Sequence, residues 1–244
     1  MSQHDMNHLP AALSTRQLTE LLYSMGHTFD NLSSTRLATE EFLRTGNPEV
    51  LGSKQDLNLL EDLQEASSFA LHYDYTSKPF DLSYLCAINA HLKRTAAIDP
   101  GVLRTSENIG VHTREGFYIP PVPHPSTLSE YFTTSLSSAY ANSFLAASTL
   151  FAQLAKAQPF GDGNKRSALL AANGLLMRTR NSDGNNDNGH SRSDTVILAV
   201  PTTDPEMSTF NDQLAAWYLH DDSTVFGWLA QWNERQQRTG GVEP

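Results

Sequence analysis

The feature that most restricts the fold is the segment 126–157, which runs for 32 residues without glycine or proline. Its large apolar residues recur mainly at three- and four-residue steps, the spacing that places side chains on one face of a helix. These residues are Leu128, Phe132, Leu136, Tyr140, Phe144, Leu150, Phe151 and Leu154. The segment therefore predicts one long core helix or two abutting ones.

Helical patterns also cover most of the remaining chain, with a capping or breaking residue at one end of each. Ser53 and Asp81 are suited to cap helices because their side-chain oxygens can accept free backbone amides. Gly26 and Gly46 are predicted stops. The segment 167–178 is apolar on most faces, as the central helix of a bundle would be. The predicted helices cover residues 14–25, about 31–45, from 53 onward, from 81 onward, 167–178, 205–219 and 223–237.

One stretch, from Asp99 to Pro125, breaks the helical pattern. Within it, residues 109–113 and 116–119 alternate in polarity around a charged pair and are followed by prolines, which predicts a small β-hairpin. The extended segment expected at 195–200 is short. The sequence therefore predicts an all-α fold, a helical bundle with one small β-hairpin.

Charge and cysteine content exclude several classes of protein. The 244 residues carry 17 Lys and Arg against 27 Asp and Glu, a net charge of −10 that disfavours a protein that coats nucleic acid. A single cysteine, Cys86, excludes an intrachain disulfide and a multi-thiolate zinc site. No signal-peptide pattern or 18-residue apolar run is present. We expect no membrane partner, no nucleic acid partner and a cytoplasmic location.

The segment 181–194 has no apolar residue and predicts a polar surface loop. Asp183, Asn185, Asp187 and Asp194 fit a calcium-loop template, but Asn188 stands where that template requires glycine. We expect no calcium site.

The loop Gln158-Pro159-Phe160-Gly161-Asp162-Gly163-Asn164-Lys165-Arg166-Ser167 carries the chemistry of the chain. It precedes a helix whose first backbone amides lack carbonyl partners. These amides, the positive end of the helix dipole and the side chains of Lys165 and Arg166 can together bind an anion. Asp162 is the only carboxylate in the loop, and beside phosphate-binding groups it suggests a magnesium ligand. Phosphate with Mg²⁺ suggests a nucleotide. The alternative is a helix–helix corner in which Asp162 caps the second helix and the cations are solvated. The glycine spacing excludes a Walker A loop.

This loop resembles the signature of the Fic/Doc (Fido) family, His-Pro-Phe-x-Asp/Glu-Gly-Asn-Gly/Lys-Arg, at every specified position except the first. The segment around Arg104 is similar to the Gly-x-x-Arg region of that family. The resemblance implies a Fic-type helical bundle whose hairpin acts as a flap. It divides the chain into a tail and helix (1–29), a Fic-like core (30–180) with its flap at 109–119, the polar loop (181–194) and a C-terminal helical extension (195–244).

The resemblance also implies an activity. Most members transfer AMP from ATP to a hydroxyl side chain of a target protein (AMPylation), and the Doc branch phosphorylates instead. By position, Asp162 would hold Mg²⁺, and Gly163, Asn164, Lys165 and Arg166 would bind the nucleotide. Lys165 matches the Doc branch, so both reactions remain open. The target would dock at the flap 109–119.

The sequence departs from the family at Gln158, where the family has the histidine that takes the proton of the target hydroxyl. An amide cannot do this, and general base catalysis is worth about 10²–10⁴-fold, so we expect impaired transfer with nucleotide binding retained. The same glutamine would result from a change introduced to silence a toxic enzyme. The rival interpretation is a non-enzymatic, degenerate Fic fold that binds nucleotide or a protein partner.

Regulation is the last expectation. In many members an inhibitory Glu from a Ser-x-x-x-Glu-Gly helix pairs with a second arginine of the motif. In this sequence Leu169 occupies the position of the second arginine. Segment 34–39 resembles the inhibitory helix, with Ala38 in place of the glutamate. A self-inhibitory or antitoxin-like partner therefore remains open. His112 and His124 flank the flap and are weaker candidates for a substitute base.

Overall fold

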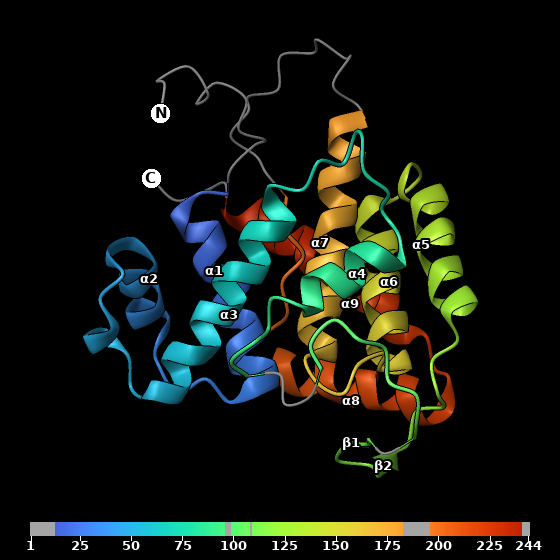
Figure 1. Ribbon diagram of the computed structural model, residues 1–244, viewed down its shortest axis with the longest axis horizontal. Helices are drawn as coiled ribbons and strands as arrows, with labels where there is room; N and C mark the ends of the chain where they lie inside the picture. The colour runs from blue at the N-terminus through green and yellow to red at the C-terminus, as the bar shows by residue number, and fades with distance from the viewer. Residues whose placement is uncertain (1–12, 96–98, 108, 183–195, 241–244) are drawn as a thin grey trace.

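A computed structural model describes residues 13–95, 99–107, 109–182 and 196–240, and its helices surround α7 (Asn164–Ser182), as Figure 1 shows. The helices that pack against α7 are α1 (Thr15–Asp30), α3 (Lys54–Leu71), α4 (Leu82–Asn89), α5 (Pro125–Ala139) and α6 (Ser143–Ala157). The remaining elements are α2 (Arg36–Thr45), the short 3₁₀ helix η1 (Pro48–Val50), β1 (Val111–His112), β2 (Phe117–Tyr118), α8 (Glu206–His220) and α9 (Thr224–Gly240). The fold is all-α with one small hairpin, as predicted.

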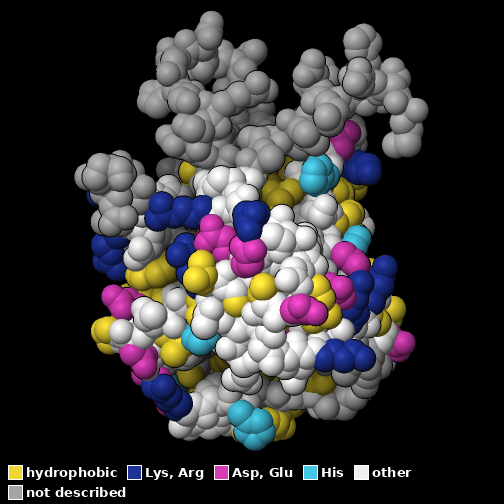
Figure 2. Space-filling view, turned by 90° about the vertical axis from the view of Figure 1, so that its left-hand side faces the viewer, with side chains coloured by type: hydrophobic (Ala, Val, Ile, Leu, Met, Phe, Trp, Pro, Cys, Tyr) yellow, Lys and Arg dark blue, Asp and Glu magenta, His cyan; other side chains and the backbone are white. Residues whose placement is uncertain are grey.

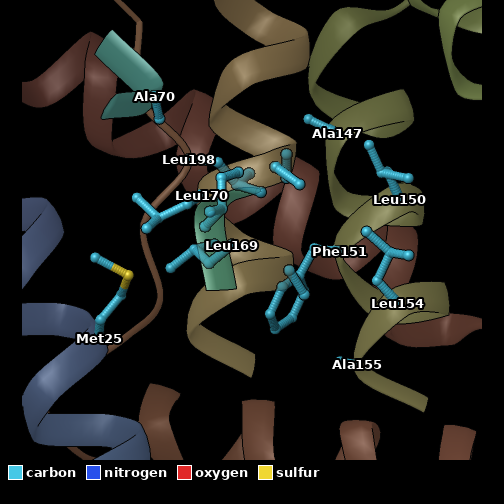
Figure 3. Close-up of a cluster of buried hydrophobic side chains, with 14 of the residues drawn as sticks. Met25, Ala70, Ala147, Leu150, Phe151, Leu154, Ala155, Leu169, Leu170 and Leu198 are labelled. Atoms are coloured by element: carbon cyan, nitrogen blue, oxygen red, sulfur yellow. The ribbon is translucent and has the colours of Figure 1, made fainter. Parts of the chain in front are cut away.

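The apolar composition of α7 explains its central place. Ala168 to Ala172 and Leu175 are almost completely buried, because neighbouring helices cover nearly every face of α7. Figure 3 shows side chains of α1, α6, α7 and the segment at Leu198 meeting in this core. The central position fixes the N-terminal end of α7, which follows the motif loop.

Local signals set the helix boundaries. The Ser53 and Asp81 side chains accept the backbone amides of Asp56 and Ser83, as their cap positions predict. The long segment 126–157 forms two helices, α5 and α6, because Asn142 caps a new helix by accepting the amide of Leu145. Gly46 ends α2 in the left-handed conformation.

The predicted stop at Gly26 is wrong. Helix α1 continues to Asp30 and ends at Asn31, which adopts the left-handed conformation. Gly26 is instead a packing site, since a Cβ there would lie 3.0 Å from Leu32 Cδ2. The extra turn brings Phe29 and Asp30 to the motif loop.

The start of the second helix also differs from the sequence pattern. Helix α2 begins at Arg36 after Thr35, whose side chain accepts the amide of Ala38. The polar residues before it have another role, because the Ser33 and Ser34 hydroxyls both donate to the Asp56 carboxylate. These bonds tie the start of α2 to α3.

The hairpin forms inside the predicted range 109–119. Val111 pairs with Tyr118 and His112 with Phe117, and the Thr113 side chain accepts the amide of Gly116 in the turn. Figure 1 shows the hairpin at one end of the molecule, beside α8.

The C-terminal segment beyond α7 is held by buried amides. Residues 196–200, expected to be extended, form no strand. The Asn173 side chain bonds both the amide and the carbonyl of Leu198, and Asn233 does the same for Ala199. Of the predicted polar loop, residues 181 and 182 end α7, and the remainder, with the calcium template, lies outside the described residues.

The surface shows no broad basic area on the face drawn in Figure 2, where Lys and Arg side chains are interspersed with Asp and Glu. Among the residues that the structure describes, no helix is both long and apolar enough to cross a membrane.

Candidate functional site

The motif loop begins at Gln158, which ends α6 in the left-handed conformation with φ 45°. Its Nε2 donates to the Ala155 carbonyl at 2.6 Å, and its own carbonyl accepts Arg104 Nε at 2.6 Å. The next residues are fixed by the segment before the hairpin, because Leu103 and Phe160 form an isolated β-bridge. Gln158 is thus held on both its side chain and its backbone.

Gly163 and Asn164 close the loop. Gly163 has φ 73°, and a Cβ there would lie 2.5 Å from Leu92 Cδ1, so a larger residue would be both strained and crowded. The Asn164 side chain bonds the amide and the carbonyl of Phe160, at 2.8 and 2.9 Å. Since that side chain is occupied, the Asn164 group free to meet an anion is its helix N-terminal amide.

Asp162 presents a carboxylate at the rim of the loop, with 41 % of its side chain exposed. Oδ1 accepts the Gly163 amide at 2.5 Å and lies 3.5 Å from Arg166 Nη2. The described residues contain no cluster of three His, Cys, Asp or Glu side chains that could hold a metal by themselves. Mg²⁺ fits such a site, because it uses one or two carboxylates together with substrate phosphates and water.

Arg166 is buried, with 3 % of its side chain exposed, so the alternative of solvated cations is wrong for this residue. Its Nη1 donates to Thr95 Oγ1 at 2.6 Å, and its Nε lies 3.3 Å from Asp30 Oδ2. Its Nη2 lies 3.5 Å from Asp162 Oδ1, so the guanidinium contacts two carboxylates. It is held rigidly at the N-terminal end of α7.

Lys165 is half-buried beside α1. Its Nζ lies 5.2 Å from the centroid of the Phe29 ring, a cation–π contact. Burial lowers the pKa of Lys165, while the nearby Asp30 carboxylate acts in the opposite direction. The lysine therefore belongs to the charged lining of the site.

These residues surround a hollow of about 170 Å³, which we call the loop hollow. The structure brings together every site residue that the motif predicted, and adds the end of α1 and the start of the hairpin. The lining residues are Phe29, Asp30, Ile109, Gly110, Gln158, Gly161, Asp162, Gly163, Asn164, Lys165 and Arg166. Ile109 and Gly110, at the start of the segment predicted as a flap, line the same hollow as Asp162.

A second hollow of about 320 Å³ lies between β1 and α8, and Lys165 lines both. We call it the α8 hollow. It has apolar and polar walls: Val111, His112, Thr113, Arg114, Asn211, Leu214, Ala215 and Tyr218. Of the two flap histidines, His112 lines this hollow, and the His124 ring contacts the Ser126 hydroxyl at the start of α5.

The sequence analysis missed Asp30, and the segment 34–39 lies away from the motif loop. Residues 34–39 do not reach the loop: Ser34 bonds to Asp56, and no residue of α2 lines the loop hollow. The carboxylate that meets the motif arginine comes from the last turn of α1. Burial raises the pKa of Asp30, although Arg166 opposes this shift. The pair Asp-Asn after an apolar helix was the available signal, which the assumed stop at Gly26 concealed.

Asp30 should weaken the binding of any anion at the loop. Asp30→Asn removes one negative charge beside Arg166, so we expect nucleotide affinity to rise about five- to thirtyfold, equivalent to about 1–2 kcal/mol of lost repulsion. Calorimetric titration of the variant measures this. Glu40→Gln on α2 makes the same charge change away from the site, and an equal gain there would show that only net charge matters.

Comparison with known proteins agrees with this geometry. The model of the Fic/DOC family matches residues 79–176. No curated protein shows significant sequence similarity to the chain.

Solved structures of Fic proteins share the fold. A Fic domain containing signaling protein from Bacteroides thetaiotaomicron matches with a TM-score of 0.66 and 17 % identity, covering 92 % of this chain and 86 % of its own. A Fic family protein from Desulfovibrio desulfuricans matches with a TM-score of 0.66 and 17 % identity, and the match covers 94 % of this chain and 67 % of that protein. Fic-1 from C. elegans matches with a TM-score of 0.59 and 19 % identity, and the match covers 96 % of this chain and 66 % of that one.

The family match contains the hairpin, the motif loop and most of α7, and it lies within the core expected at 30–180. The structural matches extend the same fold over nearly the whole chain. Residues 79–176 thus match the Fic/DOC family, and nearly the whole chain shares the fold of solved Fic proteins.

Proposed function

We propose that the chain binds a magnesium nucleotide at the motif loop and belongs with the enzymes that transfer AMP from ATP to hydroxyl side chains of target proteins, its own transfer being weak. The observation that carries this proposal is the convergence of Arg166, Lys165 and the N-terminal amides of α7 on one hollow in an acidic chain. Asp162 stands at its rim as the magnesium ligand.

The nucleotide would occupy both the loop hollow and the α8 hollow, which share Lys165 in their walls. Phosphates suit the first, where the cations and helix amides gather. The second offers Leu214, Ala215 and the Tyr218 ring for an apolar base, and the Asn211 amide for its polar edge. Lys165 lines both hollows and would meet the phosphates between them.

The chemistry of transfer explains the weak activity. In AMP transfer the target oxygen forms a bond to the α-phosphorus, the bond to the β-phosphate oxygen breaks, and pyrophosphate leaves. The hydroxyl proton must pass to a base. Gln158 stands where that base belongs, and its side chain already donates to the Ala155 carbonyl. Bound Mg²⁺ would supply charge neutralisation of the phosphates, with Asp162 as its protein ligand.

The target segment would lie along the hairpin, whose Ile109 and Gly110 line the loop hollow. Phe117 and Ile119 are about half exposed on this hairpin and offer apolar contacts. A segment that adds to a short strand gains main-chain hydrogen bonds, which suit docking with little sequence selection.

Two other functions share this site. Lys165 in the Doc-type position favours phosphorylation, in which the γ-phosphoryl group moves instead. A protein that binds nucleotide or a partner without transfer is the second. Nucleotide labelled in the α- or the γ-phosphate distinguishes the three, since only the transferred group remains on protein.

The position proposed for the nucleobase can be tested by placing a single bulky residue in the α8 hollow. Asn211→Trp would fill the α8 hollow from a half-buried position, and we expect the affinity for ATP to fall about tenfold or more, while inorganic pyrophosphate binding stays within about twofold. Competition calorimetry measures both ligands. Glu206→Trp, on the exposed first turn of the same helix, is the matched control. An equal loss of affinity for ATP and for pyrophosphate would contradict the assignment of the nucleobase to this hollow.

A further inference from the structure

Arg104 is a buried cation that binds only backbone carbonyls among the contacts of the described residues. The residue is 8 % exposed, and no carboxylate of the described residues lies within ion-pair distance of its guanidinium. Its donors instead reach five carbonyl oxygens, those of Ser106, Pro120, Pro121, Ala157 and Gln158. Burial lowers its pKa, in keeping with a cation that has exchanged water for dipoles.

The five carbonyls belong to three segments that must meet for the site to form. Ser106 precedes the hairpin, and Pro120 and Pro121 follow it, so Arg104 closes the base of the hairpin. Ala157 is the last residue of α6 and Gln158 is its C-cap, where the carbonyls have no intrahelical partner and the helix dipole is negative. A single side chain thus joins the flap to the start of the motif loop.

The backbone of the same segment strengthens this junction. The Arg104 amide donates to the Pro159 carbonyl at 3.0 Å, beside the bridge between Leu103 and Phe160. Gln158 holds a left-handed conformation, which is unfavourable for a residue other than glycine. The 2.6 Å bond from Arg104 Nε to the Gln158 carbonyl fixes the peptide in that conformation.

Arginine suits this task better than lysine. A guanidinium presents five N–H donors in a rigid plane, enough for carbonyls on several sides, whereas an ammonium has three donors around one atom. Arg104 itself does not line the loop hollow. It does not line the α8 hollow either, and none of its hydrogen bonds reaches Asp162.

We propose that Arg104 is a positioning residue: it fixes the residue at 158 and the base of the hairpin as one unit, so that the group at 158 faces a segment lying along the flap. The fixing of position 158 follows from the contacts alone. The consequence for transfer rests on the proposed function.

Amide exchange measured on the full chain tests the first part. Arg104→Met should raise exchange at the amides of Gln158 and Phe160 about tenfold or more relative to α3, since it removes hydrogen bonds from a charged donor. Arg104→Lys should give a smaller rise. Asn173→Ala, which breaks a buried network elsewhere on α7, is the control for general loss of stability. Unchanged exchange at 158 and 160, or the same pattern in Asn173→Ala, would overturn the proposal.

Transfer in the Gln158→His background tests the second part. Adding Arg104→Met should lower transfer about tenfold or more while the dissociation constant for ATP stays within about twofold, and Arg104→Lys should restore part of the rate. Equal transfer with and without Arg104 would overturn the role in positioning. If neither Gln158→His nor its combination with Asp30→Asn shows transfer, the transfer part of the proposed function has failed, and the exchange measurement still decides whether Arg104 fixes position 158.

Discussion

Gln158→His is expected to raise protein modification by about 10²–10⁴-fold, because it places a side chain that titrates near neutrality at the start of the motif loop. The Ala155 carbonyl, which now accepts from the Gln158 amide, can orient the imidazole. Gln158 lies in the loop hollow, so the new base would face the bound phosphates and the flap. Labelled ATP, magnesium and a cell lysate, followed by separation of labelled proteins, measure the gain.

The control for this change is Gln158→Asn, which retains an amide and should stay inactive. Restoration of activity has one obstacle that the sequence did not reveal, since Asp30 lies against Arg166. We therefore expect Asp30→Asn combined with Gln158→His to exceed Gln158→His alone. Silence of both variants, with nucleotide binding measured in each, would favour the non-enzymatic interpretation.

Arg166→Met should weaken nucleotide binding about tenfold or more, since a hydrogen bond to a charged group contributes about 1.5–3 kcal/mol. The loss has a second source: Asp30 and Asp162 would remain at the hollow without the cation that contacts both of them. Calorimetric titration with ATP and magnesium measures the change.

Arg44→Met is the matched control for Arg166→Met. Arg44 is exposed on α2 and pairs with Glu41, so its loss changes net charge equally but leaves the site intact. Thermal unfolding of both variants separates misfolding from lost binding. Equal affinities in wild type and a folded Arg166→Met protein would contradict the phosphate site at the loop.

Much of the fold could be predicted because its signals are local. Ser53 and Asp81 cap helices whose apolar stripes are visible in the sequence, and α7 is apolar on nearly every face because it is central. The hairpin was predictable because residues alternate in polarity on both sides of a charged pair and are followed by prolines. Each of these signals acts over a few residues, so no knowledge of tertiary contacts was needed.

The errors in the fold arose where tertiary packing decides. Gly26 has low helix propensity, yet α1 passes through it because Leu32 packs closely over its missing side chain. Ser33 and Ser34 resemble capping residues, but the buried Asp56 carboxylate of α3 takes their hydroxyls. These partners are separated along the chain and meet only in the folded protein.

The candidate site was predictable in its residues more than in their partners. The loop composition indicated a phosphate site, and the structure gathers those residues around one hollow. The sequence of the loop could not indicate that the Asn164 side chain would bond Phe160, or that Arg166 would contact Asp30 of α1. It also gave no sign that α8 forms one wall of the neighbouring hollow.

The most direct test of the account is a calorimetric titration of the unaltered chain with ATP, GTP, CTP and UTP, each with and without magnesium. We predict saturable binding of at least one nucleotide at a single site, strengthened by magnesium and weakened in Arg166→Met but not in Arg44→Met. No binding of any of the four nucleotides, or binding unaffected by the loss of Arg166, would contradict the assignment of the motif loop as a nucleotide site.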